Sequence, residues 1–370
     1  MDFLCVLRDF AALREVFLRF ILKPGYLAAF TSFLYHISMN KRALGADVLL
    51  LLTAAIWGFG FVAQRSGMLY VGPFAYNGIR FILGSLSLLP LVALRGRGRE
   101  RMKANERKNL IFSSFLAGTC LFIAVTFQQL GMMFTTAGNA GFITGLYVVL
   151  TPVFGIFLGR KTGPATWVGA FLTLTGLYFL SSAGRAGGIN PGDAVIAGGA
   201  VFWAFHVLII DRLVRKTDPI ALSTGQFAFA GFYTLAAAFL AEPSLSRWLE
   251  TLDPKLLSTG LCDWKSFPAL ISGLASGVVP LSLVSSAMVP ILYGGLASVG
   301  IGYTLQVVAQ RDAPPAHATI ILCLEGCFAV LGGVLLLNEK VGTWTMAGFA
   351  LMLGGMLASQ WEVIAGRRRE

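Results

Sequence analysis

The sequence carries little charge and lacks the motifs of soluble enzymes. Charged residues make up 13% of the 370 residues, whereas a soluble globular domain carries about 25%. There is no His-Glu-x-x-His zinc motif, no Gly-x-Ser-x-Gly nucleophile turn and no Gly-x-x-x-x-Gly-Lys-Ser/Thr phosphate loop. These absences argue against an enzyme, and we expect no cofactor.

The five cysteines have neither the spacing of a metal site nor that of a disulfide framework, so we expect no bound metal. Cys323 and Cys327 lie one helical turn apart beside Glu325, and packing is the simplest role for them.

Apolar residues dominate instead, at 56% of the chain with a mean hydropathy of +0.73. Runs of about 20 apolar residues cross the hydrocarbon core of a bilayer as helices. The 43 glycines lie inside these runs, as in closely packed membrane helices. We expect an all-α integral membrane protein with ten transmembrane helices, at residues 47–64, 73–94, 109–130, 137–158, 164–181, 194–212, 220–241, 290–310, 316–337 and 343–361.

The chain contains two copies of one pattern. An offset of 146 places Trp57 on Trp203, and an offset of 178 places Gln128 on Gln306. The difference of about 32 residues predicts an insertion within residues 242–289. The expected organisation is an interfacial extension at 1–46, a first repeat at 47–181 and a second repeat at 194–362.

Five spans in each repeat require the second copy to enter the membrane from the opposite side, as in inverted repeats. With both termini in the cytoplasm, the inner segments carry 18 Lys and Arg residues and the outer segments 6. This positive-inside bias predicts that orientation. The net charge of +11 therefore reflects membrane topology, and we expect no nucleic-acid partner.

Two segments are harder to interpret. Residues 1–38 include an amphipathic stretch and precede Met39, which we expect to be a translation start. Phe267–Val289 is apolar but interrupted by prolines, serines and glycines. We expect it to form a helical excursion at the outer face rather than an eleventh span.

Two charges lie deep inside spans. Arg80 is seven residues below Pro73, and Glu325 lies near the middle of an apolar run, where its counterpart in the first repeat is Tyr147. A buried charge in a membrane is costly and indicates a function or a partner. The two side chains either pair with each other or hold the charged ends of a substrate.

Two tryptophans at equivalent depth, Trp57 and Trp203, either flank a central cavity or fill the core. Gln128 and Gln306 either line the same path or bond between helices. Helix capping is the expected role of Asp47 and Asp193. His206 is expected to pack in the core. The candidate substrate-binding residues are Trp57, Arg80, Trp203 and Glu325.

Four segments carry a resemblance to a known family: Ala55–Phe61, Thr136–Pro152, Leu292–Gln310 and Ala313–Glu339. They resemble the bacterial EamA-domain branch of the drug/metabolite transporter superfamily. The resemblance implies a ten-helix carrier of small metabolites in the cytoplasmic membrane, with amino-acid exporters among its members. The ninth helix of that family often contains Leu-Glu-Pro, whereas here the residues are Leu324-Glu325-Gly326.

We therefore expect a secondary transporter that exports a small metabolite, such as an amino acid, across the bacterial inner membrane. A flippase of lipids or lipid-linked sugars on the same scaffold is the alternative. An intramembrane enzyme using Glu325 and His206 is a more distant one. The expected partners are a small-molecule substrate and the lipid bilayer, and a homodimer is left open.

Overall fold

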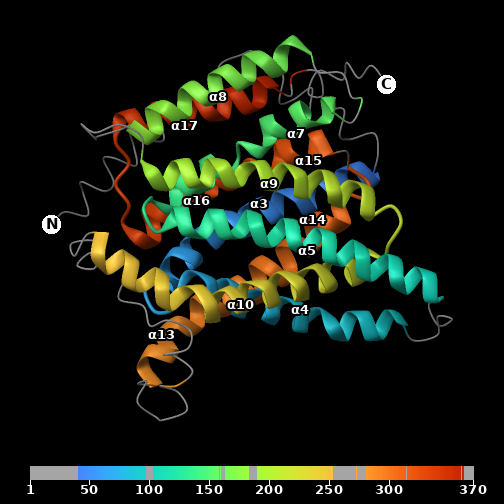
Figure 1. The fold of residues 1–370 in the computed structure, drawn as a ribbon. Helices are drawn as coiled ribbons and strands as arrows, with labels where there is room; N and C mark the ends of the chain where they lie inside the picture. The colour runs from blue at the N-terminus through green and yellow to red at the C-terminus, as the bar shows by residue number, and fades with distance from the viewer. Residues whose placement is uncertain are drawn as a thin grey trace.

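The structure is a computed structural model that describes residues 41–96, 103–157, 159, 163–182, 190–252, 272, 281–313, 315–359 and 361. Most of the long helices run across the page side by side, as in a membrane bundle (Figure 1). In chain order they are α3 (Lys41–Gly67), α4 (Pro73–Gly96), α5 (Ala104–Met132), α6 (Ala137–Thr144), α7 (Tyr147–Ile156), α8 (Pro164–Ser182), α9 (Pro191–Leu213), α10 (Pro219–Leu252), α13 (Leu281–Leu292), η1 (Tyr293–Tyr303), α14 (Thr304–Ala309), α15 (Pro315–Leu322), α16 (Glu325–Leu337) and α17 (Thr343–Ser359).

These helices form the expected membrane spans. In the described residues, eight helical segments are long and apolar enough to cross a bilayer, and α8 and α17 are shorter apolar helices of 19 and 17 residues. Three spans are composite: α6 with α7, α13 with η1 and α14, and α15 with α16. The ten segments correspond one to one with the ten predicted spans, so the all-α membrane fold is confirmed.

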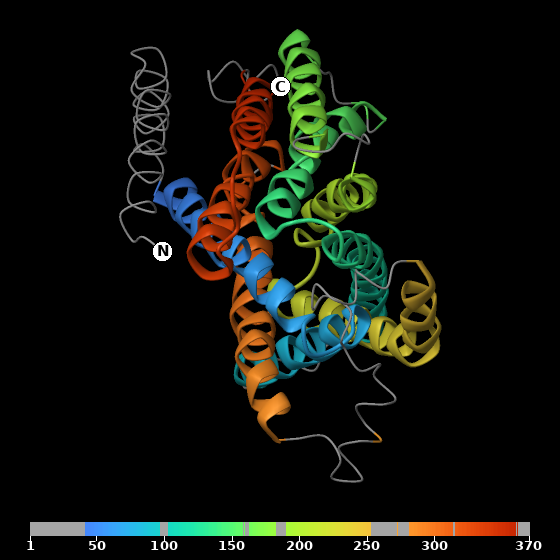
Figure 2. The same cartoon turned by 90° about the vertical axis from the view of Figure 1, so that its left-hand side faces the viewer.

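The two repeats pack around a pseudo-twofold axis. Two pairs join equivalent helices, namely α4 with α10 and α8 with α17, and the halves of the two fourth spans pack crosswise, α6 on α16 and α7 on α15. Contacts between helices at different positions of the repeat occur twice, once in each direction between the repeats. The contact of α5 with α9 is matched by that of η1 with α3, and the contact of α10 with α5 is matched by that of α4 with η1. Both views place α8 beside α17 at one edge of the bundle (Figure 1 and Figure 2). Such exchange is the signature of a twofold relation.

Large apolar side chains cover the outside of the bundle as well as filling its core, and a set of polar side chains is buried inside. Asn77 and Gln226 are fully buried, whereas Phe171 is 71% exposed and Leu240 is 80% exposed. Exposed apolar surface on this scale marks contact with lipid. The distribution agrees with a multi-pass membrane protein.

Helix starts follow simple local chemistry. Five helices begin at a proline, namely α4, α8, α9, α10 and α15. The fixed φ of proline suits the first helical position, and the first N–H group of a helix makes no intrahelical hydrogen bond, so its absence costs nothing there. The cap of α9 is Asn190, which accepts a hydrogen bond from Gly192 N over 2.9 Å.

The expectation that Asp47 and Asp193 cap their helices is wrong. Asp193 lies within the first turn of α9 behind the Asn190 cap, and Asp47 lies inside α3, which begins at Lys41. Both helices start earlier than the apolar pattern alone indicates, because α3 begins with the cations Lys41 and Arg42 and α9 begins with Pro191, Gly192 and Asp193.

Some expectations fall outside the described part of the chain. Residues 1–40 belong there, so the predictions for the N-terminal extension and for Met39 concern undescribed residues. The same holds for most of the insertion. Its first part continues α10 to Leu252, and its last part, from Leu281, forms α13 and runs directly into η1.

The crossing of α8 and α17 generates a prediction. A Cβ on Gly355 would lie 2.6 Å from Gly169 O and from Thr173 N, whereas a Cβ on the neighbouring Gly354 would meet nothing within 4 Å. Gly355→Ala should lower the thermal unfolding midpoint in detergent, since overpacking costs about 1–3 kcal/mol. Gly354→Ala should leave the midpoint unchanged or raise it, because alanine is the better helix former. Equal midpoints would contradict this packing.

Candidate functional site

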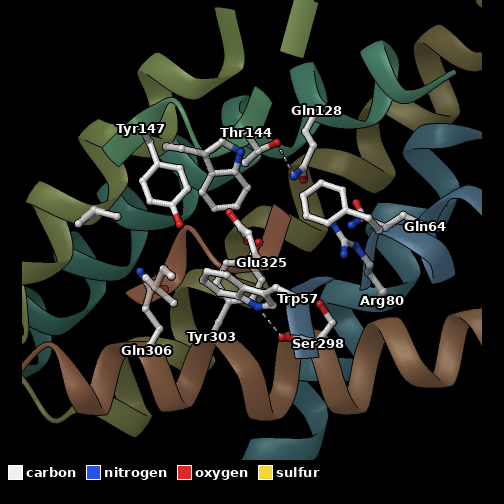
Figure 3. A pocket seen from close by; sticks show the side chains of 14 residues that line it. Trp57, Gln64, Arg80, Gln128, Thr144, Tyr147, Ser298, Tyr303, Gln306 and Glu325 are labelled. Atoms are coloured by element: carbon white, nitrogen blue, oxygen red, sulfur yellow. Dashed lines mark hydrogen bonds between the residues drawn. The ribbon is translucent and has the colours of Figure 1, made fainter. Parts of the chain in front are cut away.

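A buried cavity lies between the two repeats (Figure 3). It contains all four residues that the sequence singles out, namely Trp57, Arg80, Trp203 and Glu325. Gln128 and Gln306 also line it. The other lining residues are Phe61, Gln64, Thr144, Tyr147, Val207, Ser298, Tyr303 and Leu322.

The cavity lies at the pseudo-twofold axis. Ten of its fourteen lining residues form five pairs at equivalent repeat positions. The pairs are Trp57 with Trp203, Phe61 with Val207, Gln128 with Gln306, Thr144 with Leu322, and Tyr147 with Glu325. Only an axis that passes through the cavity brings both members of each pair to the same space.

The fourth helix of each repeat is interrupted at this cavity. The first breaks at Gly145 and Leu146, between α6 and α7, and the second breaks at Cys323 and Leu324, between α15 and α16. Glu325 is therefore the first residue of α16, where the positive end of the helix dipole favours a carboxylate. Discontinuous helices of this kind present half-helix ends to a substrate in transporters.

The second repeat departs from α-helical geometry at η1. Residues five apart on an α-helix point about 140° away from each other, whereas the i→i+5 bonding of a π-helix brings them onto one side. Ser298 and Tyr303 are five apart in η1, and both line the cavity. The Ser298 carbonyl accepts a hydrogen bond from Trp57 Nε1 over 3.2 Å, which orients that indole.

Three large rings form one wall of the cavity. The ring centroid of Tyr303 lies 4.5 Å from that of Trp57 and 6.0 Å from that of Trp203, and the two indoles are 6.4 Å apart. Trp203 stacks nearly parallel to Tyr303, at an interplanar angle of 18°. Aromatic faces of this kind bind apolar groups and organic cations.

Arg80 enters the cavity from α4 and is 1% exposed. Its Nε donates to Asn77 Oδ1 over 2.8 Å, and its guanidinium lies over the rings of Tyr76 and Phe81 at 5.7 and 5.0 Å. The Nη2 atom has no hydrogen-bond partner. Asn77 and the rings thus hold the guanidinium in place and leave one of its donor atoms available.

Arg80 and Glu325 do not form an ion pair. In the described part of the chain, neither side chain has an oppositely charged partner within 4 Å. The structural pair that the sequence left open is therefore absent. The cavity thus holds one positive and one negative group, and neither has a counter-charge among the described residues.

Further buried polar atoms of the lining residues have no hydrogen-bond partner among the described residues. They are Gln64 Oε1, Trp203 Nε1 and Gln306 Oε1, which come from both repeats. Gln128 differs, because its Nε2 donates to Thr144 Oγ1 over 3.2 Å. Buried polar atoms without partners are rare in folded proteins and indicate water or a ligand.

The cavity is closed in this conformation. Its free volume is about 20 Å³, which holds one or two water molecules at roughly 10–15 Å³ each. A metabolite of several heavy atoms needs the side chains to separate before it can enter.

His206 does not line the cavity. It lies behind the aromatic wall, edge-on to Trp203 and Tyr303, and its Nε2 is hydrogen-bonded to Gln226 Oε1 over 2.9 Å. The pairing of Glu325 with His206 that an intramembrane enzyme needs is therefore not assembled around this cavity.

Sequence reasoning missed several lining residues. Phe61 and Gln64 follow Trp57 at the i+4 and i+7 positions of one helix face, a spacing that could have identified them. Tyr303 had no such signal, because the equivalent residue of the first repeat is Val125 and the π-helix changes its direction.

Comparison with known proteins agrees with this arrangement. The family model of the EamA-like transporter family matches residues 44–182 and 190–359. The chain belongs to this family. It is therefore a multi-pass membrane transporter, and the recognition made from the sequence is confirmed.

Named relatives of this EamA-like transporter are themselves called transporters. A protein of Archaeoglobus fulgidus described as an uncharacterized transporter is 33% identical over 302 residues, which cover 80% of each chain. The inner membrane transporter YedA of Escherichia coli is 27% identical over 203 residues, covering 52% of this chain and 64% of YedA. One solved crystal structure shares the fold with a TM-score of 0.57 and 20% identity, covering 88% of this chain and 99% of that one. The names point to transport rather than catalysis.

The isolation of Arg80 generates a prediction about stability. Arg80→Gln introduces the residue found at the equivalent position of the second repeat, Gln226. The variant should keep or raise the thermal midpoint, because it removes a buried charge that has no ion partner among the described residues and leaves a donor for Asn77. Fluorescence-detected gel filtration after heating measures the midpoint. A large drop would show that the transporter needs Arg80 for its stability.

Proposed function

We propose that this EamA-like transporter moves a small zwitterionic metabolite, such as an amino acid, out of the cell. The observation that supports this substrate class is the presence of two opposite charges, Arg80 and Glu325, in one buried cavity without ion partners in the described residues. An α-amino acid supplies a carboxylate and an ammonium group a few ångströms apart.

The roles follow from the geometry of each group. Arg80 Nη2 donates to the substrate carboxylate, since guanidinium–carboxylate bonds are among the strongest in proteins. Glu325 accepts from the ammonium group, with Gln306 Oε1 as a second acceptor. The aromatic wall of Trp57, Trp203 and Tyr303 contacts the remainder of the substrate. The binding residues thus come from both repeats.

Transport proceeds by alternating access. The repeats, at about residues 47–181 and 194–362, rock around the axis and open the cavity to one side at a time. A transmembrane gradient drives any uphill movement. Both termini lie in the cytoplasm and the protein acts as a bacterial inner-membrane carrier, in line with the positive-inside bias and with the name of YedA.

A polar cluster closes the outer side in this scheme. Glu339 accepts hydrogen bonds from the first two N–H groups of α6 over 2.7 and 3.2 Å, and its Oε1 lies 3.9 Å from Arg65 Nε. Arg65 Nη1 donates to the carbonyls of Met132 and Thr135. We call Arg65 and Glu339 the outer clasp. It ties the end of α3 to the α5–α6 and α16–α17 connections.

The two charges yield the first functional test. Counterflow into liposomes with labelled amino acids, sugars and nucleosides should show saturable exchange of amino acids. Glu325→Gln should reduce this exchange by about thirtyfold or more, because it removes a buried charge that pairs with the substrate. Arg80→Gln should have a comparable effect on substrates with a free carboxylate.

Tyr147→Phe is the matched control, since Tyr147 occupies the equivalent position in the first repeat and lines the same cavity. Its exchange should stay within about threefold of the parent, because the variant removes one hydroxyl group and keeps both the ring and the Glu325 carboxyl group. Full activity in Glu325→Gln would remove this residue from the site. Silence across the panel from folded protein would favour the flippase, which a lipid-scrambling assay then tests.

The outer clasp yields a conformational test. Glu339→Gln keeps the shape of the side chain but removes its charge, so the cavity should open to the outer side of the membrane more often. Maleimide added from outside should label a cysteine introduced at Gln64 about tenfold faster, in a background without other reactive cysteines. The control is Asp218→Asn, which removes the half-exposed pair with Arg95 at 3.6 Å on the opposite side. Unchanged labelling in Glu339→Gln would refute the clasp.

A further inference from the structure

A second pocket lies on the lipid-facing surface, away from the central cavity. It runs along the first turns of α5 and reaches α10, with a volume of about 610 Å³. Its upper part is formed by Arg107 and Lys108 and its lower part by Ile111, Phe112, Phe115 and Phe229. We call these six residues the α5–α10 groove. The groove spans both repeats, since α5 belongs to the first and α10 to the second.

The charges of the groove lie at one end and its apolar groups at the other. Lys108, Phe112 and Phe115 follow one face of α5 at i, i+4 and i+7. At 1.5 Å per residue, the rings begin about 6 Å below the cations. Phe112 is 63% exposed, and Phe115 makes an edge-to-face contact with Phe229 across the groove, with centroids 5.8 Å apart.

The cations are available for a ligand. Arg107 and Lys108 are exposed and have no ion-pair partner within the described part of the chain. The nearby Glu106 is directed elsewhere, because its carboxylate accepts a hydrogen bond from the backbone N–H of Lys103. The sequence adds further positive charge, with seven Lys and Arg residues between Arg95 and Lys108 against two acids.

The position of the groove along the membrane normal indicates which kind of molecule can occupy it. The 29 residues of α5 extend about 43 Å, which exceeds the roughly 30 Å hydrocarbon core. Its first turns therefore reach the headgroup level while the rings below enter the hydrocarbon. A protein or nucleic acid from the aqueous side meets the cations but not the rings.

We propose that the α5–α10 groove binds an anionic phospholipid of the cytoplasmic leaflet. Arg107 and Lys108 hold its phosphate, and one acyl chain lies on Phe112, Phe115 and Phe229. The charge attraction of basic residues to anionic lipid at the membrane surface supports this class of headgroup. The leaflet rests on the orientation proposed above, whereas the site is independent of the transported substrate.

Native mass spectrometry of the full-length protein tests the proposal. The protein is equilibrated with phosphatidylglycerol or with phosphatidylcholine of the same acyl chains. The parent should retain phosphatidylglycerol in preference, and the double variant Arg107→Gln, Lys108→Gln should bind it about tenfold more weakly. Phe112→Ser keeps both cations but removes one of the rings that contact the acyl chain, so this variant should also retain less phosphatidylglycerol.

The matched control is Arg215→Gln, Lys216→Gln, a pair of exposed cations between α9 and α10 that does not line the groove. This double variant also loses two positive charges, and the protein should still retain phosphatidylglycerol. Equal loss in both double variants would mean unspecific attraction and overturn the site, as would equal retention in all proteins. Because the readout is lipid mass, failure of the proposed amino-acid transport leaves this result unaffected.

Discussion

A charge inside a lipid bilayer needs a polar environment, and this requirement explains much of the architecture. Arg80 and Glu325 lie deep within apolar helices, where an exposed charge costs at least several kcal/mol. The bundle encloses both in one cavity and lines it with amide, hydroxyl and indole groups. The broken helices and the π-helix exist where these groups converge, because regular helices leave their backbone polar atoms fully bonded and directed along the axis.

The cavity combines a symmetric scaffold with asymmetric chemistry. Five pairs of lining residues occupy equivalent positions, so the two repeats contribute the same surface. The charges break this equivalence, since Arg80 has Gln226 as its counterpart and Glu325 has Tyr147. Symmetry allows two conformations of similar energy that open to opposite sides. Under the proposed function, this asymmetry gives a bound zwitterion one orientation, with its negative end toward the first repeat and its positive end toward the second.

Much of the fold follows from local patterns. Apolar runs of membrane-spanning length located ten helices, and five of those helices begin at a proline. The four candidate site residues were selected from the sequence because charge and tryptophan are unusual in the middle of a span, and all four line the cavity. The predicted starts of α3 and α9 lay too far along the chain, because the residues before Asp47 and Asp193 are not part of the apolar runs. No sequence signal identified Tyr303, because its counterpart in the first repeat is Val125.

The sequence by itself determined the number of spans, the repeat and the depth of the two buried charges, since each depends on residue spacing along one helix. Tertiary structure decided that Arg80 and Glu325 share a cavity without forming an ion pair, and that Tyr303 faces the two tryptophans. Those facts depend on how helices rotate against one another. Close glycine contacts and the π-helical turn set that rotation, and spacing within one helix does not encode it.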